Sequence, residues 1–307
     1  MITETNKNIE LKLSIVIVNY KTKAFLQKCL TSIEKSEKIG IAEVIVIDNA
    51  SNDGSIEMLK QEFPSVKFII NQTNVGFAKA NNQGIKLAKA KYILLLNPDT
   101  IIFPKTLSKA TEFLDNNQNV GVVTCYVELA DGKIDPACNR GFPDPWTSFT
   151  YFVGLEKLFP KSRSFGRYHL GWLPLNTIHE IDTPSGCFYM IRKSVIDEVG
   201  LLDENYFLYY EEVDWSYRIK QKGWKIYFLP DVKIIHYKGT ASGIKKTSKE
   251  VNNVSREIKK IAINSFCDSI KIFYTKHYKK KYPFIVSHVV CIGIEIKRLL
   301  SLWQLRV

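Results

Sequence analysis

Short apolar runs alternate with helical patterns through the first hundred residues, and this alternation constrains the fold more than any other feature of the chain. Apolar runs of strand length begin at Leu13, Glu43, Val66 and Tyr92. Segments with helical spacing lie between them, the first from about Lys23 to Glu37. Strands that alternate with helices form a parallel sheet with right-handed crossovers. The pattern therefore predicts an α/β protein.

The run from Tyr92 to Leu96 is typical of a strand covered on both faces of its sheet, because it contains no charged or amide side chain. It stops abruptly at Asn97, Pro98 and Asp99. Pro98 ends the strand since it has no N–H to donate and restricts the residue before it. A carboxylate, that of Asp99, is thus left just past the end of a central strand.

Polar side chains follow the end of all four runs. They are Asn19 and Tyr20, then Asp48, Asn49 and Asp53, then Asn71 and Asn74, and finally Asn97 and Asp99. Each one alone is explained equally well as a turn former or helix cap. Ligands of parallel sheets, however, bind outside the carboxyl ends of the strands. Four polar strand ends at one edge of a sheet therefore indicate a binding site.

The first strand is not followed by a glycine-rich phosphate loop. Its end reads "VNYKT", and neither G-x-G-x-x-G nor G-x-x-x-x-G-K-[ST] is present. If this edge binds phosphate groups, a divalent metal on Asp99 is the natural alternative, because hard cations take oxygen ligands and share them with substrate phosphates.

Composition indicates a globular protein of 307 residues, with 45% hydrophobic and 24% charged residues. The six cysteines form no C-x-x-C pair, so we expect reduced thiols in a cytosolic protein rather than a zinc site or a disulfide framework. The start, "MITETNKNIELK", lacks the basic-then-apolar order of a signal peptide, and we expect no export.

The positive charge is concentrated in the C-terminal tail. Residues 245–307 hold 14 Lys and Arg against 4 Asp and Glu, a net +10 of the total +12. Lys279 to Lys281 precede an uncharged run from Tyr282 to Ile294, which is shorter than the roughly 20 residues that cross a bilayer. We expect an amphipathic segment that attaches to anionic lipid. The alternative is a packed pair of helices with a solvated basic face.

Six motifs, in order, resemble those of family 2 glycosyltransferases. They read "SIVIVNY", "VIVIDNASNDGS", "NVGFAKANNQG", "LLLNPDT", "PSGCFYMIRKSVIDEVGLLDENYFLYYEEVDWSYRIKQKGW" and "IIHYKGTAS", and they cover Leu13 to Ser242. Within the family, the chain resembles the bacterial rhamnosyltransferase-like branch that builds cell-surface polysaccharide. The resemblance implies an A-type glycosyltransferase fold: a Rossmann-like mixed, mainly parallel sheet flanked by helices. We expect a catalytic domain at 1–243 and a basic helical extension at 244–307.

The resemblance also implies a reaction: transfer of a sugar from a nucleoside diphosphate to an acceptor hydroxyl, with inversion. The donor would be held by residues matching the family's nucleotide motifs, namely Asn19, Tyr20, Asp48, Asn49, Asn74, Gly76, Asn82 and Asn97. Asp48 matches the position that reads the base, and its carboxylate can accept the N3–H of uracil or thymine. For Gly76 and Gly84, a helix-start turn and close packing are an equally good explanation.

Asp99 matches the second acid of the family's D-x-D metal motif, which implies Mg²⁺ or Mn²⁺. The first position is Asn97, whose amide is a weaker ligand than a carboxylate. His236 matches a histidine that completes the metal shell in some relatives, although a lone histidine after a strand is often structural.

The general base is expected in "EEVD", Glu211 to Asp214. The matching position points to Glu212, with Glu211 still in contention; an acidic helix start explains Asp214 alone. Ser185, Gly186 and Asp214 are expected on the acceptor side. Trp215 and Arg218 are expected to pack and pair within the fold. The aperiodic segment from 133 to 180 is expected to be a functional loop that recognises the acceptor.

The resulting hypothesis is a metal-dependent inverting glycosyltransferase that uses a pyrimidine nucleoside diphosphate sugar and acts on a glycan or lipid-linked acceptor, at the cytoplasmic face of the plasma membrane. The resemblance alone implies dTDP-rhamnose as the donor. Two alternatives remain. A nucleotidyltransferase would need a glycine-rich basic loop after the first strand, which "VNYKTKAF" lacks. A nucleic-acid-binding protein would use the basic tail but would leave Asp48, Asp99 and the two glutamates unexplained.

Overall fold

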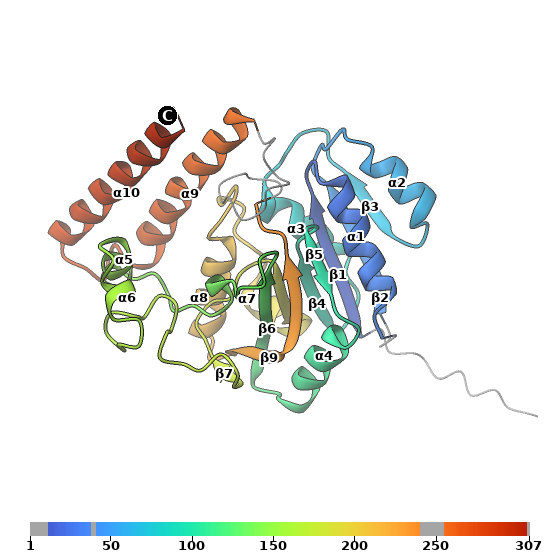
Figure 1. Cartoon of the computed structure of the whole chain (residues 1–307), viewed down its shortest axis with the longest axis horizontal. Coiled ribbons are helices and arrows are strands. Elements are labelled where there is room, and N and C mark those ends of the chain that lie inside the picture. The colour runs from blue at the N-terminus through green and yellow to red at the C-terminus, as the bar shows by residue number, and fades with distance from the viewer. Residues whose placement is uncertain (1–11, 38–40, 240–254, 306–307) are drawn as a thin grey trace, which may run out of the picture.

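The computed structural model describes residues 12–37, 41–239 and 255–305. Its core is one nine-stranded sheet flanked by helices (Figure 1). The strands are β1 (Leu13–Asn19), β2 (Ile41–Asp48), β3 (Lys67–Ile70), β4 (Tyr92–Leu96), β5 (Thr100–Ile102), β6 (Val120–Leu129), β7 (His179–Glu180), β8 (Phe188–Arg192) and β9 (Lys225–His236). Their order is β3-β2-β1-β4-β8-β6-β9-β5, and β7 pairs with β9.

The helices connect and cover these strands. They are α1 (Lys23–Glu34), α2 (Ser55–Glu62), α3 (Phe77–Leu87), α4 (Thr106–Asn116), the 3₁₀ helix η1 (Pro136–Cys138), α5 (Pro145–Phe152), α6 (Leu155–Leu158), α7 (Lys193–Val199), α8 (Glu211–Gln221), α9 (Arg256–His277) and α10 (Phe284–Gln304). The first helix ends three residues before the predicted Glu37.

The predicted alternation produces the parallel half of the sheet. β1 pairs in parallel with β2 and β4, and β2 with β3. All residues of β1 and β4 are buried, as expected for strands covered on both faces. The other half is mixed: β8 is antiparallel to β4 and β6, whereas β6 and β9 are parallel. The prediction of a mixed, mainly parallel sheet flanked by helices is confirmed.

Close packing explains one of the two glycines considered above. Gly84 faces β1, and a Cβ added there would lie 2.4 Å from Val16 Cγ1. Such a distance is far inside van der Waals contact, so any larger residue would push α3 away from the sheet.

The segment from 133 to 180 contains short helices, where the sequence predicted only loops. Asp144 caps α5 by accepting the backbone N–H of Thr147 at 2.7 Å, and Pro145 occupies the first helical turn. An acidic cap followed by proline is a recognised helix start. The periodicity of α5 is hidden because aromatic residues occupy four of its eight positions and form its exposed face.

The C-terminal helices pack on the body of the protein. Aromatic residues of α8 and α9 form a second buried cluster, which includes Tyr210, Tyr217 and Phe273. Helix α10 runs back along α9 (Figure 1). The boundary expected at residues 243–244 lies outside the described residues. Among the helices that the structure describes, none is long and apolar enough to cross a membrane.

Asp214 joins α8 to α9. Its carboxylate accepts Arg218 Nε at 2.8 Å and lies 2.7 Å from His277 Nε2 and 2.8 Å from Lys276 Nζ. Burial alone would raise the pKa of Asp214, but these hydrogen bonds hold it well below its usual range. Arg218 and the buried Trp215 pair and pack within the fold, as the sequence predicted.

Candidate active site

The ends of β1 and β2 are tied together by side-chain hydrogen bonds. Asn19 and Asp48 are partners in the strand register, and Asn19 Nδ2 donates to Asp48 Oδ1 at 2.9 Å. The Ser51 N–H donates to Asp48 Oδ2 at 3.0 Å. Asn19 and Asp48 are almost completely buried. Both predicted residues are therefore held in fixed positions at the carboxyl edge of the sheet.

The loops after β2 and β3 are joined in the same way. Asn49 Nδ2 donates to Asn74 Oδ1 at 2.8 Å, while Asn49 Oδ1 accepts the N–H of Val75 at 3.0 Å. The predicted convergence of polar side chains thus holds for the first three strand ends. Tyr20 lies beside them, half-buried, with Lys21 Nζ 5.3 Å from its ring centroid.

Backbone strain gathers at the same edge. Among described residues other than glycine, those with positive φ are Lys21, Ala50, Asn52, Leu170, Tyr209, Tyr210 and Lys238. All except Asn52 and Leu170 lie within two residues of a predicted site residue, and Asn52 adjoins the strand-end residue Asp53. Left-handed backbone at such residues costs of order 1–3 kcal/mol each and tends to occur at functional sites. The strain is therefore a second, independent indication of a site.

The start of α3 links the donor motif to the segment before α8. Gly76 has φ +89°, and an added Cβ would lie 2.8 Å from the Phe207 carbonyl oxygen. The N–H of Phe77 donates to that same oxygen at 2.7 Å. Only glycine permits this approach, so residue 76 sets the distance between the donor motif and the chain that leads to Glu211.

Asn82 of α3 also contacts the segment between α7 and α8. Its Nδ2 donates to the Leu202 carbonyl at 2.9 Å, and its Oδ1 accepts the Leu202 N–H at 3.1 Å. Both ends of the amide are thus used by the protein. These contacts position residue 202 against α3 and provide no support for direct contact between Asn82 and a donor.

Asp99 and His236 meet at the end of β4. Strand β5 begins directly after Asp99 and pairs with β9, so that Thr100 lies opposite His236. Asp99 Oδ1 is 3.1 Å from His236 Nε2, and each residue is only 5% exposed. Burial lowers the pKa of His236, but the Asp99 carboxylate outweighs this and holds the pKa well above its ordinary value.

Asn97, Asp99 and His236 provide a donor set that fits a divalent cation. Among the described residues, Asn97 Oδ1 and His236 Nδ1 have no hydrogen-bond partner although both are buried. Carboxylate, amide and imidazole atoms are ordinary ligands of Mg²⁺ or Mn²⁺. Within the described residues no group of three or more His, Cys, Asp and Glu is placed to hold a metal. A cation here would therefore need oxygen atoms from a diphosphate as further ligands.

Glu211 and Glu212 open α8, directly after the two strained tyrosines. Glu212 Oε1 accepts Arg140 Nη2 at 2.9 Å, and the same nitrogen donates to the Pro184 carbonyl at 2.7 Å. A Cβ added at Gly186 would lie 3.8 Å from Glu212 Cβ. The predicted acceptor motif, Ser185 and Gly186, is thus brought beside the predicted base.

The two glutamates differ in environment. Glu211 is 4% exposed; burial, followed by the charge of Glu212, raises its pKa well above the ordinary value. Glu212 has the guanidinium of Arg140 as its ion-pair partner. Adjacent carboxyl groups with opposed environments are a common arrangement for acid and base roles.

Buried polar atoms without partners concentrate at the ends of β4 and β9 and at the start of α8. In the described parts of the chain such side-chain atoms are Asn97 Oδ1, Arg140 Nε, Thr147 Oγ1, Glu211 Oε2, Glu212 Oε2 and His236 Nδ1. Five of these six belong to the candidate site. Buried polar groups are nearly always hydrogen-bonded in native proteins, so the concentration indicates where a ligand completes the structure.

Arg140 is a site residue that the sequence did not reveal. It follows η1 in the aperiodic segment and is 72 positions from Glu212 in the chain. The signal for it is weak, because one arginine in a loop is normally solvated. Only its burial, 9% exposed, distinguishes it.

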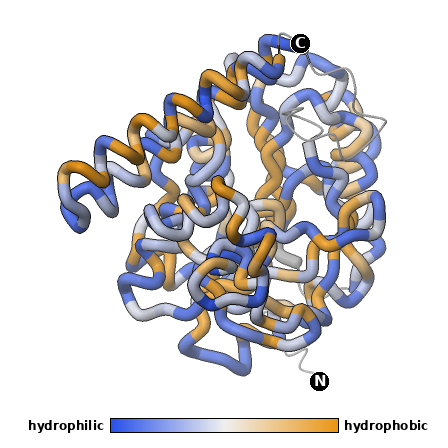
Figure 2. Tube along the Cα trace, turned by 60° about the vertical axis from the view of Figure 1, so that its left-hand side comes forward, coloured by the Kyte–Doolittle hydropathy of each residue, from blue (hydrophilic) through white to orange (hydrophobic). Residues whose placement is uncertain are grey.

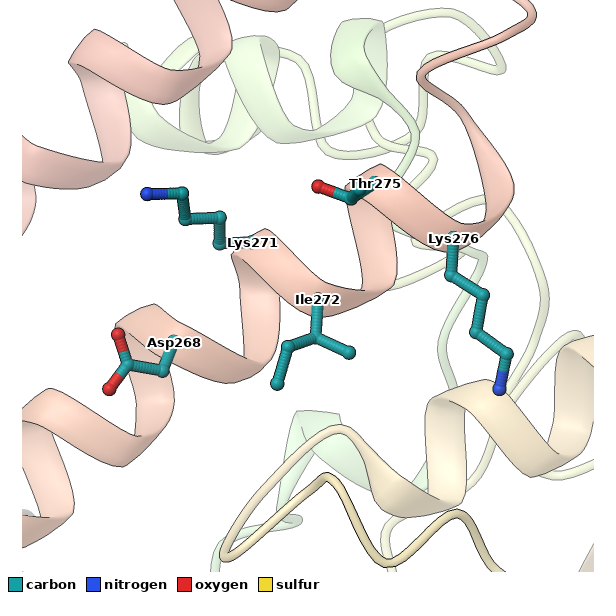
Figure 3. Close-up of a pocket in the computed structure, with 5 residues that line it drawn as sticks. All are labelled: Asp268, Lys271, Ile272, Thr275 and Lys276. Atoms are coloured by element: carbon teal, nitrogen blue, oxygen red, sulfur yellow. The ribbon is translucent and has the colours of Figure 1, made fainter.

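An open hollow of about 460 Å³ lies elsewhere, on α9 (Figure 3). Its five lining residues, Asp268, Lys271, Ile272, Thr275 and Lys276, all come from that helix, and Lys276 points toward α8. None of them is a predicted site residue. The hollow is a groove along one helix and is separate from the sheet-edge site.

Solved structures with a similar fold are glycosyltransferases. The crystal structure of GalNAc-T7 with UDP, GalNAc and Mn²⁺ matches with a TM-score of 0.56 and 18% identity; the match covers 75% of this chain, which spans only 44% of that protein. S. aureus TarS 1–349 matches with a TM-score of 0.52 and 16% identity, over 95% of this chain and 81% of TarS.

Relatives by sequence carry related names. The N-acetylglucosaminyl-diphospho-decaprenol L-rhamnosyltransferase of Mycobacterium tuberculosis is 25% identical, over 75% of this chain and 78% of its own length. The rhamnosyltransferase WbbL of Escherichia coli K12 is 23% identical, over 73% and 82%. The family model "Glycosyl transferase family 2" matches residues 14–200. The chain therefore belongs to glycosyl transferase family 2 and is a glycosyltransferase of the rhamnosyltransferase-like kind.

Proposed function

We propose that the protein transfers a sugar from a nucleoside diphosphate to an acceptor hydroxyl, with inversion, at the carboxyl edge of the sheet. The observation that carries this proposal is that the site contains two groups of buried polar atoms without hydrogen-bond partners among the described residues. One group belongs to Asn97 and His236, and the other to Glu211, Glu212 and Arg140. The first group suits a metal and diphosphate. The second suits a hydroxyl group that loses a proton.

On the donor side, the fixed Asn19 and Asp48 would meet the nucleoside together with Tyr20. A carboxylate oxygen has about two acceptor sites, so Asp48 retains capacity for the N3–H of a pyrimidine while it holds Asn19 and Ser51. The linked loops of Asn49 and Asn74 would form the floor beneath the ribose. Gly76 and Asn82 would contribute by positioning α3.

At the end of β4, Asp99, His236 and Asn97 would hold Mg²⁺ or Mn²⁺ beside the diphosphate. A cation bound there supplies charge neutralisation for the leaving phosphate oxygen. Asp99 is fixed at the sheet edge by its contact with His236 and by its carbonyl, which accepts the Tyr237 N–H at 3.0 Å.

On the acceptor side, Glu212 would act as the general base. Glu212 Oε2 would take the proton from the acceptor hydroxyl while the hydroxyl oxygen forms a bond to the anomeric carbon of the donor sugar. The bond between that carbon and the diphosphate oxygen breaks at the same time. One displacement of this kind inverts the configuration. Ser185 and Gly186 would allow the acceptor to approach, since the small residues leave space beside Glu212.

For the sugar we propose L-rhamnose from dTDP-rhamnose. Rhamnose is supported by the rhamnosyltransferases of Mycobacterium tuberculosis and Escherichia coli, which are 25% and 23% identical, and dTDP by the dTDP-rhamnosyl transferase RfbF of Shigella flexneri, which is 25% identical. A glycan or lipid-linked glycan of cell-surface polysaccharide is the corresponding acceptor class.

Calorimetric titration tests the donor site. We expect the purified protein to bind UDP or dTDP more tightly than GDP or ADP, because Asp48 can accept the pyrimidine N3–H, and to bind more tightly with Mn²⁺ than with EDTA. Absence of nucleotide binding with and without metal would contradict the proposal. Equal affinity for all four nucleotides would remove Asp48 from the base-reading role while leaving the metal site intact.

We also propose that α10 and α5–α6 attach the enzyme to anionic lipid at the inner face of the plasma membrane. Apolar residues recur along α10 (Figure 2). Those more than half exposed include Ile285, Val289, Ile292, Ile296, Leu299 and Trp303. Spacings of three and four residues place them on one face of the helix. An exposed apolar stripe of this kind is typical of helices that lie in the membrane interface.

The apolar surface continues onto the neighbouring elements. Lys297 Nζ of α10 is 5.9 Å from the ring centroid of Phe152, the last residue of α5. Exposed apolar residues on α5–α6 and the residues after them include Trp146, Phe149, Phe152, Leu158 and Phe159. Between Ser255 and Leu305 there are ten Lys and Arg against three Asp and Glu. The charge favours anionic lipid over a second copy of the same basic surface.

Co-sedimentation with vesicles tests this attachment. We expect binding to vesicles that contain phosphatidylglycerol, weaker binding at high salt, and little binding to pure phosphatidylcholine. An Ile292→Asp, Ile296→Asp double variant should bind at least about tenfold more weakly, because two charges enter the apolar stripe. Ile70→Asp with Leu87→Asp, also exposed but on β3 and α3, is the matched control. A stable dimer that the α10 variant dissociates, without vesicle binding, would contradict the proposal.

A further inference from the structure

Arg140 contacts the candidate base from a distant part of the chain. One guanidinium nitrogen, Nη2, donates both to Glu212 Oε1 at 2.9 Å and to the Pro184 carbonyl at 2.7 Å. The side chains of Arg140 and Glu212 are only 10% and 15% exposed. Because the Pro184 carbonyl belongs to the backbone before Ser185 and Gly186, the guanidinium fixes Glu212 relative to the acceptor motif.

Only one of the two carboxylate oxygens of Glu212 has a hydrogen-bond partner. Oε1 accepts from Arg140, whereas Oε2 is buried and has no partner among the described residues. A carboxylate that is anchored through one oxygen and unpartnered at the other has a defined orientation and a free basic atom. The cost of burying an unpaired charged oxygen is substantial, so this arrangement suits an atom that is completed by a substrate hydroxyl.

Glu211 has no such anchor. Within the described residues its Oε2 has no hydrogen-bond partner, and burial raises its pKa well above the ordinary value, with the charge of Glu212 adding to the effect. A raised pKa favours the protonated form of a carboxyl group, and that form cannot accept a proton from an acceptor. The two neighbours therefore differ in the one property that a general base needs.

The remaining groups facing Glu212 are neutral. They are Tyr189 of β8, which stacks on Trp215, and Tyr210, which precedes α8. Burial raises the pKa of both phenols above the ordinary value, so neither carries charge in the working range. Burial lowers the pKa of Arg140, but Tyr168 and Glu212 outweigh this and raise it further. Among the described residues, Arg140 is the cation that forms an ion pair with Glu212.

We propose that Arg140 is the positioning residue that makes Glu212, rather than Glu211, the general base. It orients the carboxylate toward the acceptor through the shared contact with Pro184, and it places a positive charge 2.9 Å from Glu212 Oε1. This inference rests on the proposed transfer reaction and assigns a function to a residue outside the motifs that resemble the family.

The pH dependence of kcat distinguishes this role from a structural one. Activity should rise with pH as the base loses its proton. A nearby positive charge favours the ionised form, so removing it in Arg140→Gln should move the acidic limb upward by about one pH unit or more. At neutral pH we expect kcat to fall about tenfold to hundredfold, with nucleotide affinity unchanged.

Two further variants provide the controls. Arg140→Lys keeps the charge but loses the planar fork, so the acidic limb should stay in place while kcat falls. Lys220→Met breaks a different partly buried ion pair on α8, that of Lys220 with Asp182 at 2.8 Å, without touching Glu212. It should lower the melting temperature and leave the pH profile unchanged.

The outcomes separate clearly. A wild-type acidic limb in Arg140→Gln, or equal shifts in the Gln and Lys variants, would overturn the inference. If Arg140→Gln does not fold, Arg140→Lys decides: an unchanged kcat would overturn the positioning role. A wild-type enzyme that transfers no sugar would instead contradict the proposed function, and this inference with it.

Discussion

Replacing Asp99 by Ala should lower turnover by about three orders of magnitude and remove the stimulation of nucleotide binding by Mn²⁺. The carboxylate lies at the end of β4, is nearly completely buried, and contacts His236 at 3.1 Å. Its loss removes the charged oxygen donor from the proposed cation site. Initial rates of sugar transfer and calorimetric titration of dTDP, with Mn²⁺ and with EDTA, measure the two effects.

The matched control for Asp99→Ala is Asp115→Ala. Asp115 makes ion pairs of 2.8 Å with Lys12 and Lys91 at the opposite end of the sheet. Its loss should lower stability without changing metal-dependent binding. Full activity of Asp99→Ala in the presence of metal would remove Asp99 from the proposed role, and an equal loss in both variants would point to general destabilisation.

Replacing Glu212 by Gln should lower kcat by about 10²- to 10⁴-fold while dTDP binding is kept. The amide preserves the shape of the side chain but cannot accept a proton, and the donor site lies at the ends of other strands. Measured rates and calorimetric affinities on the same preparation separate the loss of chemistry from loss of binding.

Glu211→Gln is the natural comparison for Glu212→Gln. Burial raises the pKa of Glu211, which favours the neutral carboxyl group, and an amide in its place should cause a much smaller loss. A larger loss in Glu211→Gln than in Glu212→Gln would assign the base to Glu211. Wild-type activity of Glu212→Gln would exclude Glu212 from the reaction.

Much of the fold was predictable because local patterns and packing agree. The β-branched run of β1 and the apolar run of β4 are buried strands, and the intervening helices form as predicted. The polar residues at the first three strand ends converge because parallel strands present their carboxyl ends at one edge. The family assignment also answers the choice between a glycosyltransferase, a nucleotidyltransferase and a nucleic-acid-binding protein in favour of the first.

The contacts between distant segments were not predictable. His236 meets Asp99 only because β5 pairs with β9, and Arg140 meets Glu212 only because the segment after η1 folds over α8. Asp214 was expected on the acceptor side, yet its carboxylate contacts Arg218, Lys276 and His277. These contacts provide no support for an acceptor role, and in sequence an acid that joins two helices looks the same as one that meets a substrate.

The sequence by itself determined the alternation of strands and helices, the polar strand ends and the membership of a family, since these depend on residue periodicity and on motifs a few residues long. Tertiary structure decided which carboxylate is anchored, which is buried with a raised pKa, and which polar atoms have no partner among the described residues. Burial and charge proximity depend on neighbours that lie tens of residues away in the chain. They raise the pKa of Glu211 and set the orientation of Glu212, which no local pattern encodes.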